Sequence, residues 1–255
     1  LSNVFKDEGI TIINSKLSSV ESIAGSDGTH LATCANSEIV KGDVMLVATG
    51  RQPVVNGMGL SEIGVELNES GGINVNDKLM SATNGIYAAG DCTGDEQFTH
   101  YAGYQGAVAA RNILLPFSDP GVLEYVPATT FTDPEIASVG MTEEAAKQAL
   151  GVDAVQVSIQ YVKDTDRGVC EDVKGGLVKI IYQKKGYKIL GATIMSPGAG
   201  EMIAEISVAM KTNLTFDMLA TVMHTYPSYS FALQSMAAEV YYNKLLKLQG
   251  ILKFL

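Results

Sequence analysis

Two apolar runs that end in glycine stand out in the first half of the chain. Val44–Thr49 is followed by Gly50, and Gly85–Ala89 runs into Gly90 and Asp91. A continuous apolar run of this length is typical of a strand that is buried on both faces, as in a parallel sheet. The pattern therefore predicts two buried strands, each ending at a glycine.

Shorter patterns predict the elements around these runs. β-rich stretches at Gly9–Ile13, near Val20 and at His30–Thr33 favour short strands, with a turn at 25–28. From about Thr99 to Leu115, apolar and small residues recur at helical spacing. This segment predicts a helix whose small side chains allow close approach to a neighbour.

Residues 116–127 contain three prolines and mark a domain boundary. The segments beyond it alternate between strand and helix patterns, and two of the strands are joined by a short turn typical of an antiparallel hairpin. Thr142 is a suitable N-cap for the first of the helices. The expected elements are strands at 135–140, 177–182 and 189–195, and helices at 142–150, 201–212 and 229–249.

Composition narrows the possible functions. The chain has 255 residues, 46% hydrophobic and 18% charged, with a net charge of −10. This acidic balance argues against nucleic acid as a partner, and no apolar run approaches the ~18 residues of a membrane span. The cysteines, Cys34, Cys92 and Cys170, are too far apart in sequence for a disulfide framework or a zinc site, so we expect no metal. Their use suits a reducing compartment, the cytoplasm or an organelle interior.

The ends of the two apolar runs are candidate binding positions. Glycine lets backbone approach a ligand, and Gly50 is followed by the cationic Arg51. Asp91 can accept hydrogen bonds from a sugar-like hydroxyl, or it can cap the helix that follows. Each motif alone is also explained by an ordinary turn.

In order along the chain, five motifs resemble the FAD-dependent pyridine nucleotide–disulfide oxidoreductases, the family of dihydrolipoamide dehydrogenase, glutathione reductase and mercuric reductase. They are ATGRQP at 48–53, GINV at 72–75, IYAAGD at 86–91, FTDPEIASVG at 131–140, and GAT at 191–193 with GEMI at 200–203. The resemblance implies an α/β part of a Rossmann-like FAD/NAD(P)-binding domain, followed by an α+β dimerisation domain with an antiparallel sheet. It places a remnant of the NAD(P) domain at 1–48, half of the FAD domain at 49–120 and the dimerisation domain at 126–255.

The resemblance also implies residue roles. Asp91, after Gly90, would hold the ribityl chain of FAD, and Gly50 with Arg51 would lie by the nicotinamide dinucleotide or the adenine side of FAD. The residues that would lie near the flavin ring are Phe98, Thr99 and His100. The helix that starts there would direct its positive end at the flavin. For His100, the alternative is an exposed residue at a helix start.

A third motif concerns acid–base chemistry. The family has a histidine directly before a proline, and a glutamate four residues after that proline. The histidine and the glutamate act as acid and base for the thiols of the partner subunit. Here the positions hold Tyr226 and Phe231 around Pro227, so the usual pair is absent. Tyr226 is the candidate proton donor, or else a packed interface aromatic. His224 is two residues early, and we expect it to point elsewhere.

The family's GxGxxG fingerprints and redox-active cysteine pair do not occur in these 255 residues, and the first residue is Leu1. We therefore expect the C-terminal portion of a longer enzyme, inactive alone. The whole protein would pass electrons from NAD(P)H through FAD to a disulfide, a metal ion or another small acceptor, as a homodimer formed through 126–255. The alternatives are a non-catalytic dimerisation module and, less favoured, a one-domain flavin or nucleotide binder.

Overall fold

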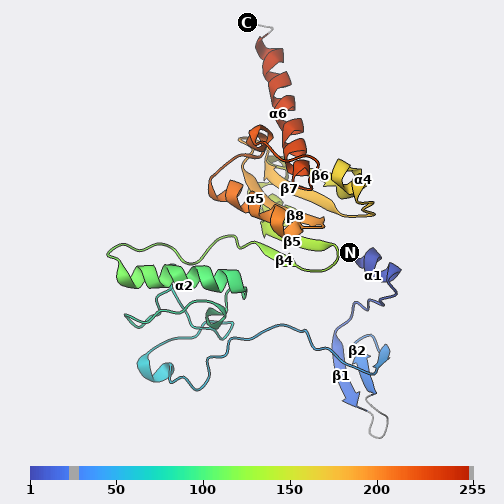
Figure 1. Cartoon of the computed structure of the whole chain (residues 1–255). Coiled ribbons are helices and arrows are strands. Elements are labelled where there is room, and N and C mark those ends of the chain that lie inside the picture. The colour runs from blue at the N-terminus through green and yellow to red at the C-terminus, as the bar shows by residue number, and fades with distance from the viewer. Residues whose placement is uncertain (23–28, 253–255) are drawn as a thin grey trace. The chain divides into compact units, whose positions relative to one another are not determined.

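A computed structural model describes residues 1–22 and 29–252 of the chain (Figure 1). The chain divides into two compact units, Leu1–Gln52 and Pro53–Leu255, which are described separately. The turn expected at 25–28 lies outside the described residues.

The first unit is a short helix and a small antiparallel sheet. Helix α1 (Ser2–Asp7) precedes the strands β1 (Leu17–Ser22), β2 (His30–Cys34) and β3 (Ile39–Gly42), which pair in that order. The strands expected near Val20 and at 30–33 are confirmed. The strand expected at Gly9–Ile13 is wrong: that segment is irregular and has no strand partner among the described residues.

The apolar run Val44–Thr49 is not the buried strand that its pattern predicts. The segment has no strand assignment, and the side chains of Val44 and Leu46 are 88% and 89% exposed. A strand needs a neighbour for its backbone N–H and C=O groups. None of the described strands pairs with this segment, since the small sheet consists of β1, β2 and β3 alone.

The second unit begins with an irregular layer. Isolated bridges replace regular strands here, and the run Gly85–Ala89 takes part in one of them, between Met80 and Tyr87. The strand expected at 85–89 is therefore also wrong, although Ala88 is buried in a small cluster with Val55. The helical elements are η1 (Ser61–Ile63), η2 (Asp91–Thr93) and α2 (Thr99–Leu114). Helix α2 confirms the expected helix to within one residue.

A five-stranded antiparallel sheet follows the proline-rich connection. Its order is β4-β5-β8-β7-β6. The strands are β4 (Ala128–Thr130), β5 (Glu135–Gly140), β6 (Val155–Tyr161), β7 (Leu177–Gln183) and β8 (Ile189–Ser196). The expected strands and the hairpin of β7 and β8 are confirmed, and so is the antiparallel sheet with helices.

Helices cover both faces of this sheet. They are α3 (Glu143–Leu150), α4 (Asp166–Cys170), α5 (Ala199–Lys211) and α6 (Phe231–Leu252), with short turns η3 (Val152–Ala154), η4 (Val162–Asp164) and η5 (Phe216–Thr221). Thr142 is the N-cap of α3, as expected, and its side chain accepts a hydrogen bond from Ala145 N–H. Residues of α5 and α6 share the main core with one face of the sheet, whereas Ala146 of α3 packs on the other.

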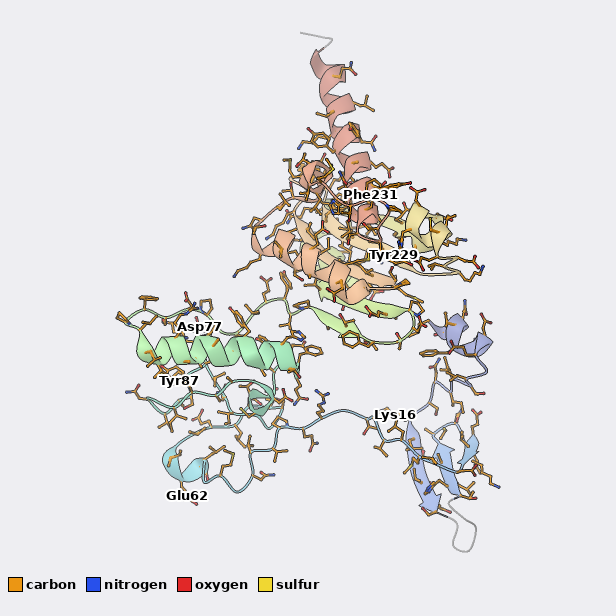
Figure 2. The ribbon with its side chains drawn as sticks, in the orientation of Figure 1. Lys16, Glu62, Asp77, Tyr87, Tyr229 and Phe231 are labelled. Atoms are coloured by element: carbon orange, nitrogen blue, oxygen red, sulfur yellow. The ribbon has the colours of Figure 1, made fainter. Side chains whose placement is uncertain are left out.

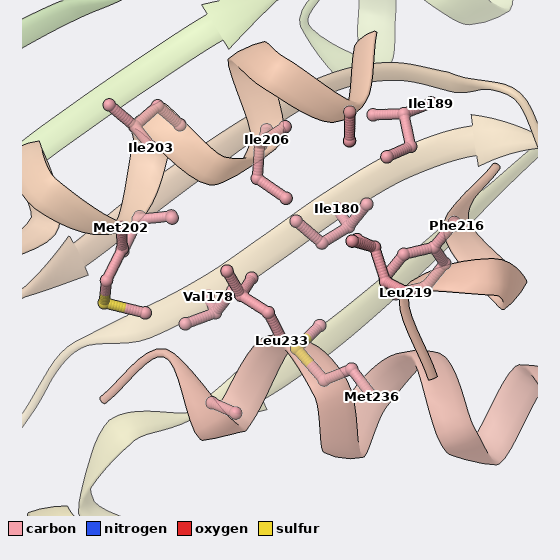
Figure 3. Close-up of a cluster of buried hydrophobic side chains, with 14 of the residues drawn as sticks. Val178, Ile180, Ile189, Met202, Ile203, Ile206, Phe216, Leu219, Leu233 and Met236 are labelled. Carbon is pink, nitrogen blue, oxygen red and sulfur yellow. The ribbon is translucent and has the colours of Figure 1, made fainter. Parts of the chain in front are cut away.

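The main core explains why these segments fold together. Alternate residues of β7, Val178 and Ile180, point into a cluster that contains Ile206 of α5 and Leu233 of α6 (Figure 3). Each large aliphatic side chain buried in this way stabilises the fold by roughly 1.5–3 kcal/mol. Val162 of η4 and Leu219 of η5 also lie in this core, which therefore holds the turns that precede α4 and the loop before α6.

Candidate functional site

The turn at Gly90 and Asp91 is packed tightly against α2. Gly90 has a φ of 81°, and a Cβ at this position would lie 2.8 Å from the Cβ of Ala102. Its N–H donates a hydrogen bond to the buried side-chain oxygen of Gln105, at 2.7 Å. Only glycine tolerates both the positive φ and the close helix, so the backbone before Asp91 is held by α2.

Asp91 presents an exposed carboxylate at the start of η2. Phe98 occupies the N-cap position of α2, and no side chain caps that helix. The alternative in which Asp91 caps the following helix is therefore wrong. A glycine-lined turn, an exposed carboxylate and an uncapped helix N-terminus are features that fit a hydroxylated, negatively charged cofactor such as FAD.

The first residues of α2 have partners within the second unit. The rings of Phe98 and His100 stack with centroids 5.3 Å apart. His100 Nε2 lies 2.8 Å from the carbonyl oxygen of Pro127, to which its N–H donates. His100 is thus an exposed helix-start residue that ties α2 to the connection before β4. Proximity of Phe98, Thr99 and His100 to a flavin stays a prediction.

Gly50 and Arg51 belong to the first unit, whereas Gly90 and Asp91 belong to the second. Gly50 has a φ of 122°, a conformation that favours glycine, and both Gly50 and Arg51 are exposed. That Gly50 and Arg51 lie by the nicotinamide dinucleotide or the adenine side of FAD stays a prediction as well.

Tyr226 lies in the loop between η5 and α6, with its side chain 63% exposed. Its ring meets the ring of Phe231 edge to face, with centroids 5.3 Å apart and planes at 77°. Figure 2 labels Phe231, at the start of α6, together with the nearby Tyr229. A hydrogen bond to the carboxylate of Asp166, together with its negative charge, raises the pKa of the Tyr226 phenol.

Tyr226 and Asp166 line a polar cavity of about 120 Å³. The wall also includes Arg167, Ser228 and Ser235. Sequence reasoning identified Tyr226 but missed Asp166, because α4 is far from the loop along the chain. The only signal in the sequence was Thr165, a possible N-cap before Asp166.

His224 points away from this cavity, as expected from its position. Its Nε2 lies 2.7 Å from Oε1 of Glu205 on α5, and its Nδ1 lies 2.9 Å from the carbonyl oxygen of Val222. The side chain is only 6% exposed. The Nε2 contact therefore holds the loop onto α5, whereas the Nδ1 contact lies within the loop itself.

No group of three or more His, Cys, Asp or Glu side chains is placed to hold a metal ion within residues 1–22 and 29–252. Over the same ranges, no helix is both long and apolar enough to cross a membrane.

Comparisons with known proteins agree with the order of the motifs. The family model of the pyridine nucleotide-disulphide oxidoreductases matches residues 1–106, and the model of their dimerisation domain matches residues 126–237. Mitochondrial dihydrolipoyl dehydrogenase 1 of Arabidopsis thaliana is 36% identical over 236 residues, which cover 90% of this chain and 45% of the relative. Mercuric reductase of Bacillus cereus is 32% identical over 227 residues, covering 89% and 36%.

Solved structures give the same picture. LpdA of Mycobacterium tuberculosis superposes with a TM-score of 0.84 at 29% identity, covering 93% of this chain and 51% of that one. The flavoprotein disulfide reductase RclA of Escherichia coli has a TM-score of 0.82 at 26% identity, covering 93% and 54%. The chain thus spans about half the length of these relatives or less. Members of the family are FAD-dependent and use NAD(P)H as electron donor. By its two family models and its relatives, this chain belongs to the class I pyridine nucleotide–disulfide oxidoreductases.

Proposed function

We propose that this chain serves an oxidoreductase that passes electrons from NAD(P)H through FAD to a disulfide, a metal ion or another small acceptor. The observation that carries the proposal is the Gly90–Asp91 turn, held against α2 by the 2.7 Å hydrogen bond to Gln105. The family to which the chain belongs supports the choice of cofactor. FAD, when bound, supplies the electron transfer, while the protein binds and orients it.

In this proposal, some of the chain's own residues bind the cofactors and one residue donates a proton. Asp91 accepts hydrogen bonds from the ribityl hydroxyls, and the N-terminal end of α2 offers its positive dipole to the flavin. Gly50 and Arg51 lie by the dinucleotide or the adenine. Tyr226 holds a proton at its hydroxyl oxygen and donates it to the acceptor.

The domain arrangement is also part of the proposal. Residues 126–255 form the dimerisation domain of a homodimer, 49–120 contribute to the FAD domain, and 1–48 contribute to the NAD(P) domain. The match of a dimerisation-domain model to residues 126–237 supports the first of these assignments. By the resemblance, the Tyr226 loop serves the site of the partner subunit.

The substitution Asp91→Ala tests the cofactor role. Losing hydrogen bonds to a charged acceptor costs about 1.5–3 kcal/mol, so FAD affinity should fall by roughly 10- to 100-fold. Flavin absorbance per protein, measured after dialysis of the purified holoenzyme, reports the change. Glu96→Gln removes a nearby exposed carboxylate and is the control. Full flavin retention in Asp91→Ala would contradict the assignment.

A non-catalytic dimerisation module is the second candidate. It is favoured by the extent of the main core, which is built entirely from residues after the proline-rich connection, apart from the contribution of Tyr125. Absence of bound flavin and of NAD(P)H oxidation in the purified protein, combined with a stable dimer, would select this candidate instead.

A further inference from the structure

A second cavity, of about 520 Å³, lies within the second unit. Residues of α2, of the proline-rich connection, of β5 and β8, and of the C-terminal part of α5 line it. Its volume is within the roughly 300–1,000 Å³ typical of small-molecule sites. The cavity is therefore large enough for a ligand, and the chemistry of its lining decides which kind.

The buried part of the lining is apolar. Val139 of β5 and Ile189 of β8 line the cavity and are only 4% and 2% exposed. Both belong to the main core, and the partly buried side chains of Tyr125 and Met210, which also line the cavity, pack against that core. Because the core holds this surface in place, an apolar group can bind here without ordering new protein structure.

The lining also contains two tyrosine rings. Tyr104 of α2 is 38% exposed, and its hydroxyl donates to the carbonyl oxygen of Pro120 at 3.4 Å. The hydroxyl of Tyr125 donates to Oε1 of Glu124 at 2.5 Å. Burial, together with this carboxylate, raises the pKa of Tyr125 to about 12, so its phenol is neutral at pH 7. Both rings thus offer neutral aromatic surface to a flat ring.

Two lysines make the lining positively charged. Lys188 lies just before β8, and Lys211 is the last residue of α5. Neither ammonium group has an ion-pair partner in the described part of the chain. The described lining contains one carboxylate, that of Glu124, which already accepts the hydrogen bond from Tyr125. One positive charge is therefore in excess, although the whole chain has a net charge of −10.

We propose that this cavity binds a small aromatic carboxylate, whose ring lies on the apolar lining and whose carboxylate meets Lys188 and Lys211. A single negative charge matches the single excess positive charge, and the tyrosine rings favour an aromatic body over an alkyl chain. The site does not depend on the proposed function, because its lining includes none of the residues assigned there to FAD, to the dinucleotide or to proton donation.

The ligand class is tested with 1-naphthylacetate and its uncharged analogue 1-naphthylacetamide. Each is titrated into the 255-residue protein at pH 7 and low salt, with calorimetry as the readout. Naphthylacetate should bind with one equivalent per chain, and the amide should bind about 5- to 30-fold more weakly, since it forms no ion pair with either lysine. Equal affinity for both compounds, or no saturable binding of naphthylacetate, would overturn the proposal.

Substitution of the lysines tests the position of the carboxylate. Lys188→Met and Lys211→Met should each weaken the binding of naphthylacetate by about 2- to 5-fold and leave the binding of the amide unchanged. Lys185→Met removes an exposed lysine from the turn before Lys188, outside the lining, and is the control. An equal loss in Lys185→Met would mean that overall charge attracts the ligand, and the proposal would be wrong.

Substitution of Tyr104 tests the position of the ring. Tyr104→Ala should weaken the binding of the acid and of the amide alike, by about 2- to 10-fold, because both lose an aromatic contact. Tyr242→Ala removes a ring that is 63% exposed on α6 and lies outside the lining, so affinity should not change. Unchanged affinity in Tyr104→Ala would place the ligand elsewhere and overturn the proposal.

Discussion

The carboxylate of Asp217, only 1% exposed, accepts a hydrogen bond from the ammonium group of Lys244 at 2.5 Å. Asp217 lies in η5 and Lys244 lies on α6, so the pair ties the last helix to the turn before the Tyr226 loop. The hydroxyl of Thr215 donates to the other carboxylate oxygen at 2.6 Å.

Replacing Lys244 with Met should therefore destabilise the domain. It leaves a buried carboxylate with one partner, which costs about 2 kcal/mol once the 38% exposure of the lysine side chain is considered. The hydrogen bond to Asp217 raises the pKa of Lys244, so this stabilisation is present below the ordinary value of 10.5 and is lost as pH rises above it. Urea unfolding at pH 7 and above 10.5 measures the difference, with Lys185→Met as an exposed control. Equal losses of unfolding free energy in Lys244→Met and Lys185→Met would contradict the prediction.

Glu143 should stabilise the sheet in an acid-sensitive manner. Hydrogen bonds from Lys147 and Lys179 lower its pKa from 4.5 to about 2. Because the folded pKa is depressed, the stabilisation is present above pH 4.5 and disappears as pH falls through about 2. The difference in melting temperature between wild type and Glu143→Gln should follow this course. Glu144→Gln removes the adjacent charge of the same turn and should show a smaller difference; an equal one would refute the ion-pair explanation.

Two alanine substitutions, one at a glycine beside α2 and one at a glycine within it, should change the stability of the protein in opposite directions. Gly90→Ala brings a Cβ within 2.8 Å of Ala102 at a φ of 81°, and should cost about 1–3 kcal/mol while lowering flavin content. Gly103 lies in α2 with nothing within 4 Å of an added Cβ. Gly103→Ala should therefore stabilise the helix by up to ~1 kcal/mol. Thermal unfolding distinguishes them, and a harmless Gly90→Ala would show that the turn can shift.

Tyr226→Phe should separate the two half-reactions of the holoenzyme. The substitution removes a hydroxyl but keeps the ring contact with Phe231. Acceptor reduction should fall by about 10²–10⁴-fold, as for other general acids, and flavin reduction should be unaffected. Rapid-mixing absorbance measurements of each step give the result. An equal loss in both steps would defeat the role of Tyr226 as a proton donor.

Local signals predicted much of the second half of the chain. Thr142 marked the start of α3, and alternation along β7 marked the hairpin, because both signals act within a few residues. The apolar runs 44–49 and 85–89 gave wrong strands, since a strand depends on neighbours that its own sequence does not specify.

For the same reason, the sequence predicted some residues of the candidate site but not the contacts between them. Tyr226 and Asp91 stand in recognisable motifs, whereas Tyr226 and Asp166 line one cavity only because the fold brings α4 beside the loop. The bond of His100 to Pro127 likewise joins two segments whose proximity no local pattern encodes.

The hydrogen bond between His224 and Glu205 links the Tyr226 loop to α5, and the neighbouring residue of that helix, Ile206, lies in the main core. A repacking around Ile206 that tilts α5 would displace the phenol without any substitution near it. Lower turnover in such a variant would then be caused by displacement of the proton donor, and not by a smaller amount of folded protein.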